Sequence, residues 1–167
     1  MNRFFVDAET DGLYGGFLST AALVTDESGT QTDRFYGAVR VKEEDIRSQW
    51  VIENVYPYLN NADRFFDSEA DLLAAFWEFW LKYRDSSVCI AYVQYPVEAN
   101  LFRKCVEVNM SERALLAPFP IYDLSTLLIA KGYDFNADLQ QLTGLELVSH
   151  DAMNDVLLTA KAWQMLK

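Results

Sequence analysis

Two carboxylates, Asp7 and Glu9, stand at the end of an apolar run near the start of the sequence, in the segment FFVDAETDGLYGG. If this run forms a β-strand, residues i and i+2 point to the same side and lie roughly 6–7 Å apart. Like charges this close cost free energy unless a positive group lies between them, and a divalent cation is such a group. The pair alone also fits a strand that ends at Asp7, with both acids in a solvated turn.

A second group of titratable residues lies near the end of the sequence. His150, the only histidine, precedes Asp155 by five residues in the segment SHDAMNDVLLTA. Side chains at this spacing point apart on a regular helix, so the two converge only if His150 lies at the irregular start of a helix. A helix start rich in acids also has an ordinary explanation, because the helix dipole favours them there.

A fourth acid, Glu98, lies in the first turn of the helix expected after the apolar run at residues 86–93. Open α/β sheets form their sites in the crevice beyond the carboxyl ends of the strands. Glu98 is placed to reach such a crevice, although it too fits an ordinary acid of a first helical turn.

The elements that must position these residues run from strands to helices and back. We expect strands at residues 2–9, 86–93 and 119–124, and a hairpin at 17–41 with its turn at 27–29. We expect helices at 42–59 with a break near Pro57, at 68–84 with Ser68 as N-cap, at 96–110, at 125–132, and at 149–167 with Ser149 as N-cap. This order predicts an α/β domain with a mixed central sheet and helices on both faces.

The composition is that of a folded chain with an acidic surface. Its 167 residues are 51% hydrophobic and carry a formal charge of −11, which suits a single domain over residues 1–167. No run fits a membrane span or a signal peptide, and Cys89 and Cys105 lie in apolar surroundings typical of buried, reduced thiols, so we expect a cytoplasmic protein. The charge argues against broad gripping of duplex nucleic acid but allows a nucleic acid held locally at a metal.

Taken together, these segments resemble the DEDDh family of 3′–5′ exonucleases, which have an RNase H-like fold. DAETDGL is similar to the first family motif, YVQYPVEANLF to the second, and HDAMNDVLLTAKAW to the third, and YDLSTLLIAK is similar to the segment before the last motif. The resemblance spans nearly the whole chain and is nearest to the small bacterial exoribonuclease branch that includes ribonuclease T. The second motif departs from the family, with Glu98 where Asp is usual and Gln94 where Asn is usual.

The resemblance implies a site that holds two divalent cations, Mg²⁺ or Mn²⁺. Asp7, Glu9, Asp155 and Glu98 would be the metal ligands, and His150 would accept the proton of the attacking water. Thr10, Gly12 and Leu13, in the turn after the first strand, would contact the terminal nucleotide, with Gln94 as a further contact.

The resemblance also implies the substrate and the partners. We expect hydrolysis of single-stranded ends or short 3′ overhangs to nucleoside 5′-monophosphates, with RNA favoured over DNA, no membrane partner, and a possible homodimer. The alternative is a catalytically impaired nucleic-acid-binding module of the same fold, which the changed acid at Glu98 allows.

Overall fold

A mixed sheet forms the centre of the molecule in the computed structural model, which describes residues 1–167. The sheet has six strands in the order β4-β3-β2-β1-β5-β6. The strands are β1 (Asn2–Thr10), β2 (Phe17–Thr25), β3 (Gln31–Val39), β4 (Arg64–Phe66), β5 (Ser87–Ala91) and β6 (Ile121–Asp123). β1, β2 and β3 are antiparallel neighbours, whereas β5 pairs in parallel with both β1 and β6, and β4 pairs in parallel with β3.

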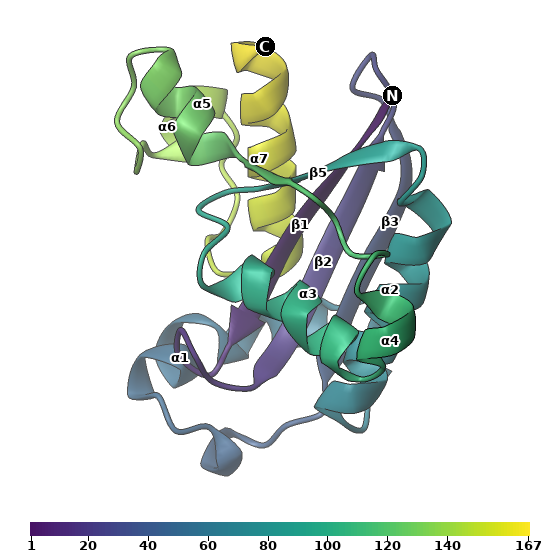
Figure 1. Ribbon diagram of the computed structural model, residues 1–167. Helices are drawn as coiled ribbons and strands as arrows, with labels where there is room; N and C mark the ends of the chain where they lie inside the picture. Colours follow the sequence, from purple (N-terminus) through teal and green to yellow (C-terminus); the bar gives the residue numbers. More distant parts are fainter.

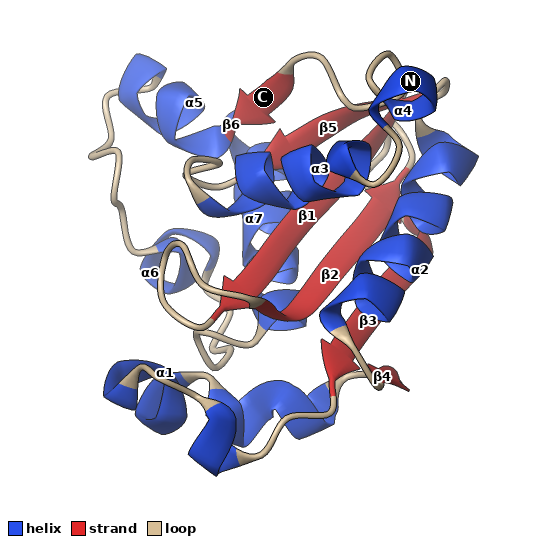
Figure 2. Cartoon of the chain, turned by 60° about the horizontal axis from the view of Figure 1, so that its bottom comes forward, coloured by secondary structure: helices blue, strands red, loops and turns tan.

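Helices cover both faces of this sheet. They are α1 (Gln49–Asn54), α2 (Glu69–Tyr83), α3 (Val97–Glu107), α4 (Met110–Arg113), α5 (Leu124–Ala130), α6 (Leu139–Thr143) and α7 (Ala152–Leu166), with the 3₁₀ segments η1 (Glu43–Asp45) and η2 (Tyr56–Asn61). Figure 2 shows α2 and α3 in front of the sheet and α7 behind it. The predicted α/β fold with a mixed sheet is therefore confirmed.

Alternation along β1 sorts its side chains between the two faces. Phe4, Val6 and Ala8 pack with residues of α2 and α3, whereas Phe5 packs with residues of α7. Asp7 and Glu9 follow Phe5 at the same period of two, so their carboxylates lie on the face that α7 covers.

The parallel partner of β1 is shorter than β1 itself. The pairing of β1 with β5 runs only from Asn2 opposite Ser87 to Phe5 opposite Ile90, while β2 accompanies β1 almost to its end. Beyond Phe5 the β5 edge of β1 is therefore open. In Figure 1 the end of β1 lies beside the start of α3, away from the two termini.

Most expected elements are present. The hairpin of β2 and β3 forms as predicted, and α2 begins after Ser68, whose hydroxyl accepts a hydrogen bond of 3.1 Å from the Asp71 N–H. Both cysteines are free and buried. None of the helices combines the length and apolar character that crossing a bilayer requires.

Two local predictions were wrong. The segment 42–59 is not one broken helix: it forms the 3₁₀ segment η1, the short helix α1 and the 3₁₀ segment η2, and only the predicted break near Pro57 is present, between α1 and η2. α7 is capped by Asp151, not by Ser149, because the Asp151 carboxylate accepts from the Met153 and Asn154 N–H groups. In addition, β4, α4 and α6 were not predicted, because they are three to five residues long and lack a clear periodic pattern.

Candidate metal centre

The acids predicted from the sequence meet at the open end of β1. Glu9 contributes its carboxylate from β1, Asp155 from the first turn of α7, and His150 its imidazole from just before that helix. One ligand atom from each of these residues lies within 4.8 Å of the others, close enough for one metal ion to contact all three. Asp7 lines the same cleft, two residues before Glu9.

The backbone at His150 resolves the awkward spacing between His150 and Asp155. His150 adopts φ of 64°, in the left-handed region that residues other than glycine occupy rarely. Its N–H donates a hydrogen bond of 2.9 Å to Oδ2 of Asp155. The chain thus turns sharply before the helix, as the sequence required for these two side chains to converge.

Glu98 reaches the site from the opposite face of the sheet. α3 packs against the face that carries Val6 and Ala8, yet Glu98 stands in its first turn, near the open edge of β1. Oε1 of Glu98 accepts a hydrogen bond of 3.3 Å from the Ala8 N–H, a donor that a longer β5 would otherwise take. Glu98 is only 4% exposed, so this acid lies in the interior.

Burial and mutual repulsion disfavour the charged forms of these acids. Burial, followed by the charges of Glu98, Asp155 and Glu9, raises the pKa of Asp7 well above its ordinary value. Burial likewise raises the pKa of Glu9 to about 8, that of Glu98 to about 8 and that of Asp155 to about 6. No Lys or Arg is among the causes of these shifts, so the acids are either protonated or neutralised by a cation that the chain does not supply.

The donor set fits a hard divalent cation. Carboxylate oxygens are the ligands that Mg²⁺ and Mn²⁺ prefer, and four carboxylates line this cleft, two of them in the compact group with His150. Burial lowers the pKa of His150, which keeps the imidazole neutral and able to accept a proton at neutral pH.

The centre opens into a cleft of about 470 Å³. Apart from the acids and His150, side chains from the first turn, the β5–α3 loop and the α6 region line it, among them Leu13, Tyr92, Tyr95, Asn136 and Leu139. Leu13 thus lines the cleft, and its contact with the terminal nucleotide stays a prediction. Thr10, Gly12 and Gln94 do not line the cleft: Thr10 is buried, Gly12 takes φ of 78° in the turn, and the Gln94 N–H donates to Asp123.

Two further residues beside the centre were not singled out as site residues. Asp151 is 4% exposed and its Oδ2 accepts a hydrogen bond of 2.7 Å from the Asn61 amide. The indole of Trp50 in α1 lies edge-on to the His150 ring, with 4.8 Å between the ring centroids. No local pattern could have revealed either contact, because each joins segments that are far apart in the sequence.

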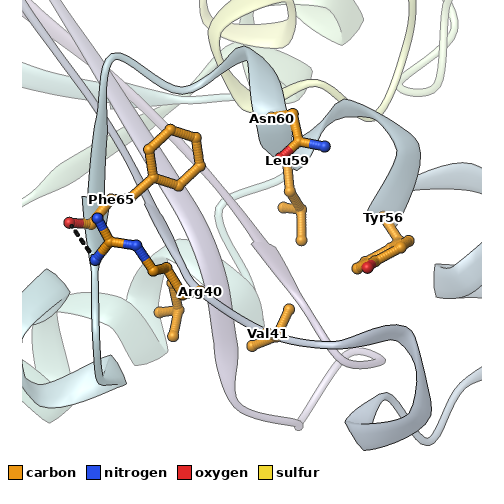
Figure 3. A pocket seen from close by; sticks show the side chains of 7 residues that line it. Arg40, Val41, Tyr56, Leu59, Asn60 and Phe65 are labelled. Atoms are coloured by element: carbon orange, nitrogen blue, oxygen red, sulfur yellow. Dashed lines mark hydrogen bonds between the residues drawn. The ribbon is translucent and has the colours of Figure 1, made fainter.

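A second cavity, of about 350 Å³, lies between the end of β3, β4 and η2, and Figure 3 shows its lining. Arg40, Val41, Tyr56, Leu59 and Phe65 line it, and no carboxylate does. The Arg40 guanidinium donates a hydrogen bond of 2.7 Å to the Asp67 carboxylate and one of 3.4 Å to the Phe65 carbonyl oxygen. This cavity therefore lacks the ligands for a metal, and the cleft at β1 is the better candidate.

Comparison with solved structures places the fold. Exonuclease I of E. coli, in its zinc-bound complex with single-stranded DNA, is similar with a TM-score of 0.73 and 18% identity, over 99% of this chain and 40% of that one. A moderately thermophilic exonuclease I from Methylocaldum szegediense is similar with a TM-score of 0.69 and 16% identity, over 98% of this chain and 40% of that one. The E. coli enzyme in complex with a dT13 oligonucleotide has a TM-score of 0.64 and 18% identity, over 99% of this chain and 41% of that one.

The comparisons bear on the fold alone. No protein-family model matches the sequence, and no curated protein matches it. The chain covers about 40% of the length of the exonuclease I structures, and the identities are low. What the likeness establishes is that this chain has the RNase H-like fold of exonuclease I.

Proposed function

We propose that this chain is a metal-dependent 3′–5′ exonuclease acting on single-stranded nucleic acid. The observation that carries the proposal is the convergence of Glu9, His150 and Asp155 within 4.8 Å, beside Asp7 and Glu98, at the end of β1. The likeness to exonuclease I, whose solved structures include complexes with single-stranded DNA, supports the same activity.

The chemistry follows from the charges involved. Two divalent cations, Mg²⁺ or Mn²⁺, would neutralise charge on the phosphate and on the leaving oxygen when bound. Asp7, Glu9 and Asp155 would hold them, and Glu98 would contribute directly or through water. His150 accepts the proton of the attacking water, which its lowered pKa suits at neutral pH. The products are nucleoside 5′-monophosphates.

The cleft favours short contacts with a single strand. A formal charge of −11 repels long polyanions, so productive contacts are confined to the few nucleotides nearest the centre. Two of the solved neighbours are complexes with single-stranded DNA or a dT13 oligonucleotide, whereas the motif resemblance favours RNA. DNA and RNA must therefore be compared directly as substrates. Homodimer formation and a cytoplasmic location stay predictions.

A degradation assay tests the proposal. Linear and circular single strands of DNA and RNA, the linear ones labelled at the 5′ end, are incubated with Mg²⁺, Mn²⁺ or EDTA. We expect a ladder that shortens from the 3′ end with either metal, and no product in EDTA. Cutting of the circular strands would contradict an exonuclease. The ratio of the DNA and RNA rates decides the preferred substrate.

The second candidate function is a module that binds nucleic acid without cutting it. The observation that favours it is Glu98, whose longer side chain already uses Oε1 on the Ala8 N–H. If wild-type protein binds single strands but does not cut them, and Glu98→Asp gains cleavage, the impaired module is the correct assignment.

The first prediction concerns two acids of the centre. Asp7→Asn and Asp155→Asn should each reduce cleavage to near background, because each removes a negative ligand from a shared metal site. Each also relieves repulsion among buried acids, so in EDTA the variants should melt at the same temperature as wild type or higher. Asp85→Asn, at an exposed ion pair, is the control. Full turnover in either variant would refute the metal assignment.

The second prediction concerns stability against pH in EDTA. Because the pKa of Glu9 is raised to about 8 in the folded protein, the folded state holds a proton that the unfolded state loses at lower pH. Glu9 therefore makes the stability fall as pH rises from about 4.5 to 8, with no further change outside that window.

Thermal melts from pH 5 to 8 measure this effect. Glu9→Gln replaces the titrating carboxyl group by a neutral amide. The melting temperature of the variant should therefore exceed that of wild type by a margin that grows with pH. Mn²⁺ at pH 8 should stabilise wild type more than the variant, because it binds the folded site. Parallel curves for the two proteins would contradict the raised pKa.

The third prediction concerns the proton acceptor. His150→Ala should lower kcat by about 10²–10⁴, the usual range for loss of a general base. Affinity for Mn²⁺, measured by calorimetry, should drop much less than in Asp155→Asn. An equal drop in both variants would make His150 a principal metal ligand and not the base.

A further inference from the structure

The imidazole of His150 lacks the partner that usually orients a proton-accepting histidine. Its hydrogen bond to Asp155 is made by the backbone N–H, not by the ring. A ring nitrogen lies within 4.8 Å of carboxylate oxygens of Glu9 and Asp155, but the only hydrogen bond from His150 to these acids is the one from its backbone. A catalytic imidazole is commonly held by a carboxylate or a backbone carbonyl on its second nitrogen. Here the ring must be oriented by packing.

Trp50 supplies that packing. Its ring lies 4.8 Å from the His150 ring between centroids, at an interplanar angle of 78°, which is the edge-to-face arrangement that aromatic rings prefer. Trp50 is 52% exposed, unlike Trp77 and Trp80, which are almost completely buried in the core. Core formation therefore does not explain why an indole stands at this position.

The segment that carries Trp50, residues 47–61, is tied at both ends to the chain beside the centre. At its start, the Asp11 carboxylate accepts hydrogen bonds of 2.9 Å from the Arg47 N–H and 3.0 Å from the Ser48 N–H. At its end, the Asn61 amide donates 2.7 Å to Asp151. Asp11 follows Glu9 by two residues, and Asp151 follows His150 directly.

Apolar contacts of its buried side chains also hold segment 47–61 in place. Its buried side chains form a small core of their own with the neighbouring residues, made of Leu18, Ile46, Val51, Val55 and Leu59. Trp50 does not belong to this cluster. The segment is thus a fixed support that places an exposed indole against the His150 ring.

We propose that Trp50 is a positioning residue for His150, and that segment 47–61 sets the orientation of the imidazole toward the attacking water. The proposal rests on the proposed function, because it assumes that His150 accepts a proton. It assigns to α1 a part in proton transfer and not in metal binding.

Proton NMR of the metal-free protein tests the contact without any assay of activity. His150 is the only histidine, so its ring protons give a single identifiable set of signals. The ring current of Trp50 should displace these signals in wild type. Trp50→Ala should return them most of the way toward the values of free histidine, and Trp50→Phe should retain part of the displacement. Phe119→Ala, at a fully exposed ring outside the cleft, is the control and should leave them unchanged.

Steady-state kinetics with Mn²⁺ and a single-stranded substrate test the consequence. Trp50→Ala should lower kcat by roughly 10–100-fold with KM nearly unchanged, as expected when a reacting group is misplaced but the substrate still binds. Trp50→Phe should recover most of kcat, and equal melting temperatures would show that folding is intact.

The outcomes separate the two levels of the argument. Unchanged His150 signals in Trp50→Ala, or a rise in KM alone, would overturn the positioning role while the nuclease proposal stands. Absence of cleavage by wild type would overturn the nuclease proposal and with it the catalytic purpose of the contact. A kcat loss restored by Trp50→Phe, together with the displaced signals, supports both.

Discussion

Repulsion among buried carboxylates is the constraint on which the rest of this structure depends. Asp7, Glu9, Glu98 and Asp155 share one end of the sheet, and burial raises the pKa of each. A fold tolerates such a cluster only if a counter-charge is available or the acids stay protonated. The extensive apolar core on both faces of the sheet supplies the stability that this arrangement requires.

The cluster forms because helices on opposite faces of one sheet begin at the same end of β1. α7 brings Asp155 and the preceding His150 to one face, and α3 brings Glu98 to the other. The early end of β5 allows Glu98 to reach the β1 backbone. The acids and His150 therefore all gather around the end of β1, whereas the 47–61 segment approaches from outside the sheet.

Residues whose positions follow from local periodicity could be predicted from the sequence. The period of two in β1 placed Asp7 and Glu9 together, and the requirement that His150 and Asp155 converge implied an irregular helix start, which the φ of His150 provides. The cap of α7 was predicted at Ser149 but is Asp151, because both residue types are good N-caps and the distant Asn61 amide engages Asp151. The Trp50 contact was beyond reach for the same reason: both depend on how distant segments pack.

The open edge of β1 has a consequence for the behaviour of the molecule in a concentrated solution. An unpaired strand edge is a template on which another chain can add a strand, and such edges promote aggregation. Here the Ala8 N–H is already bonded to Glu98, so this donor is not free to pair with a strand of another chain. Glu98, one of the acids at the centre, thus also covers part of the strand edge on which another chain could add.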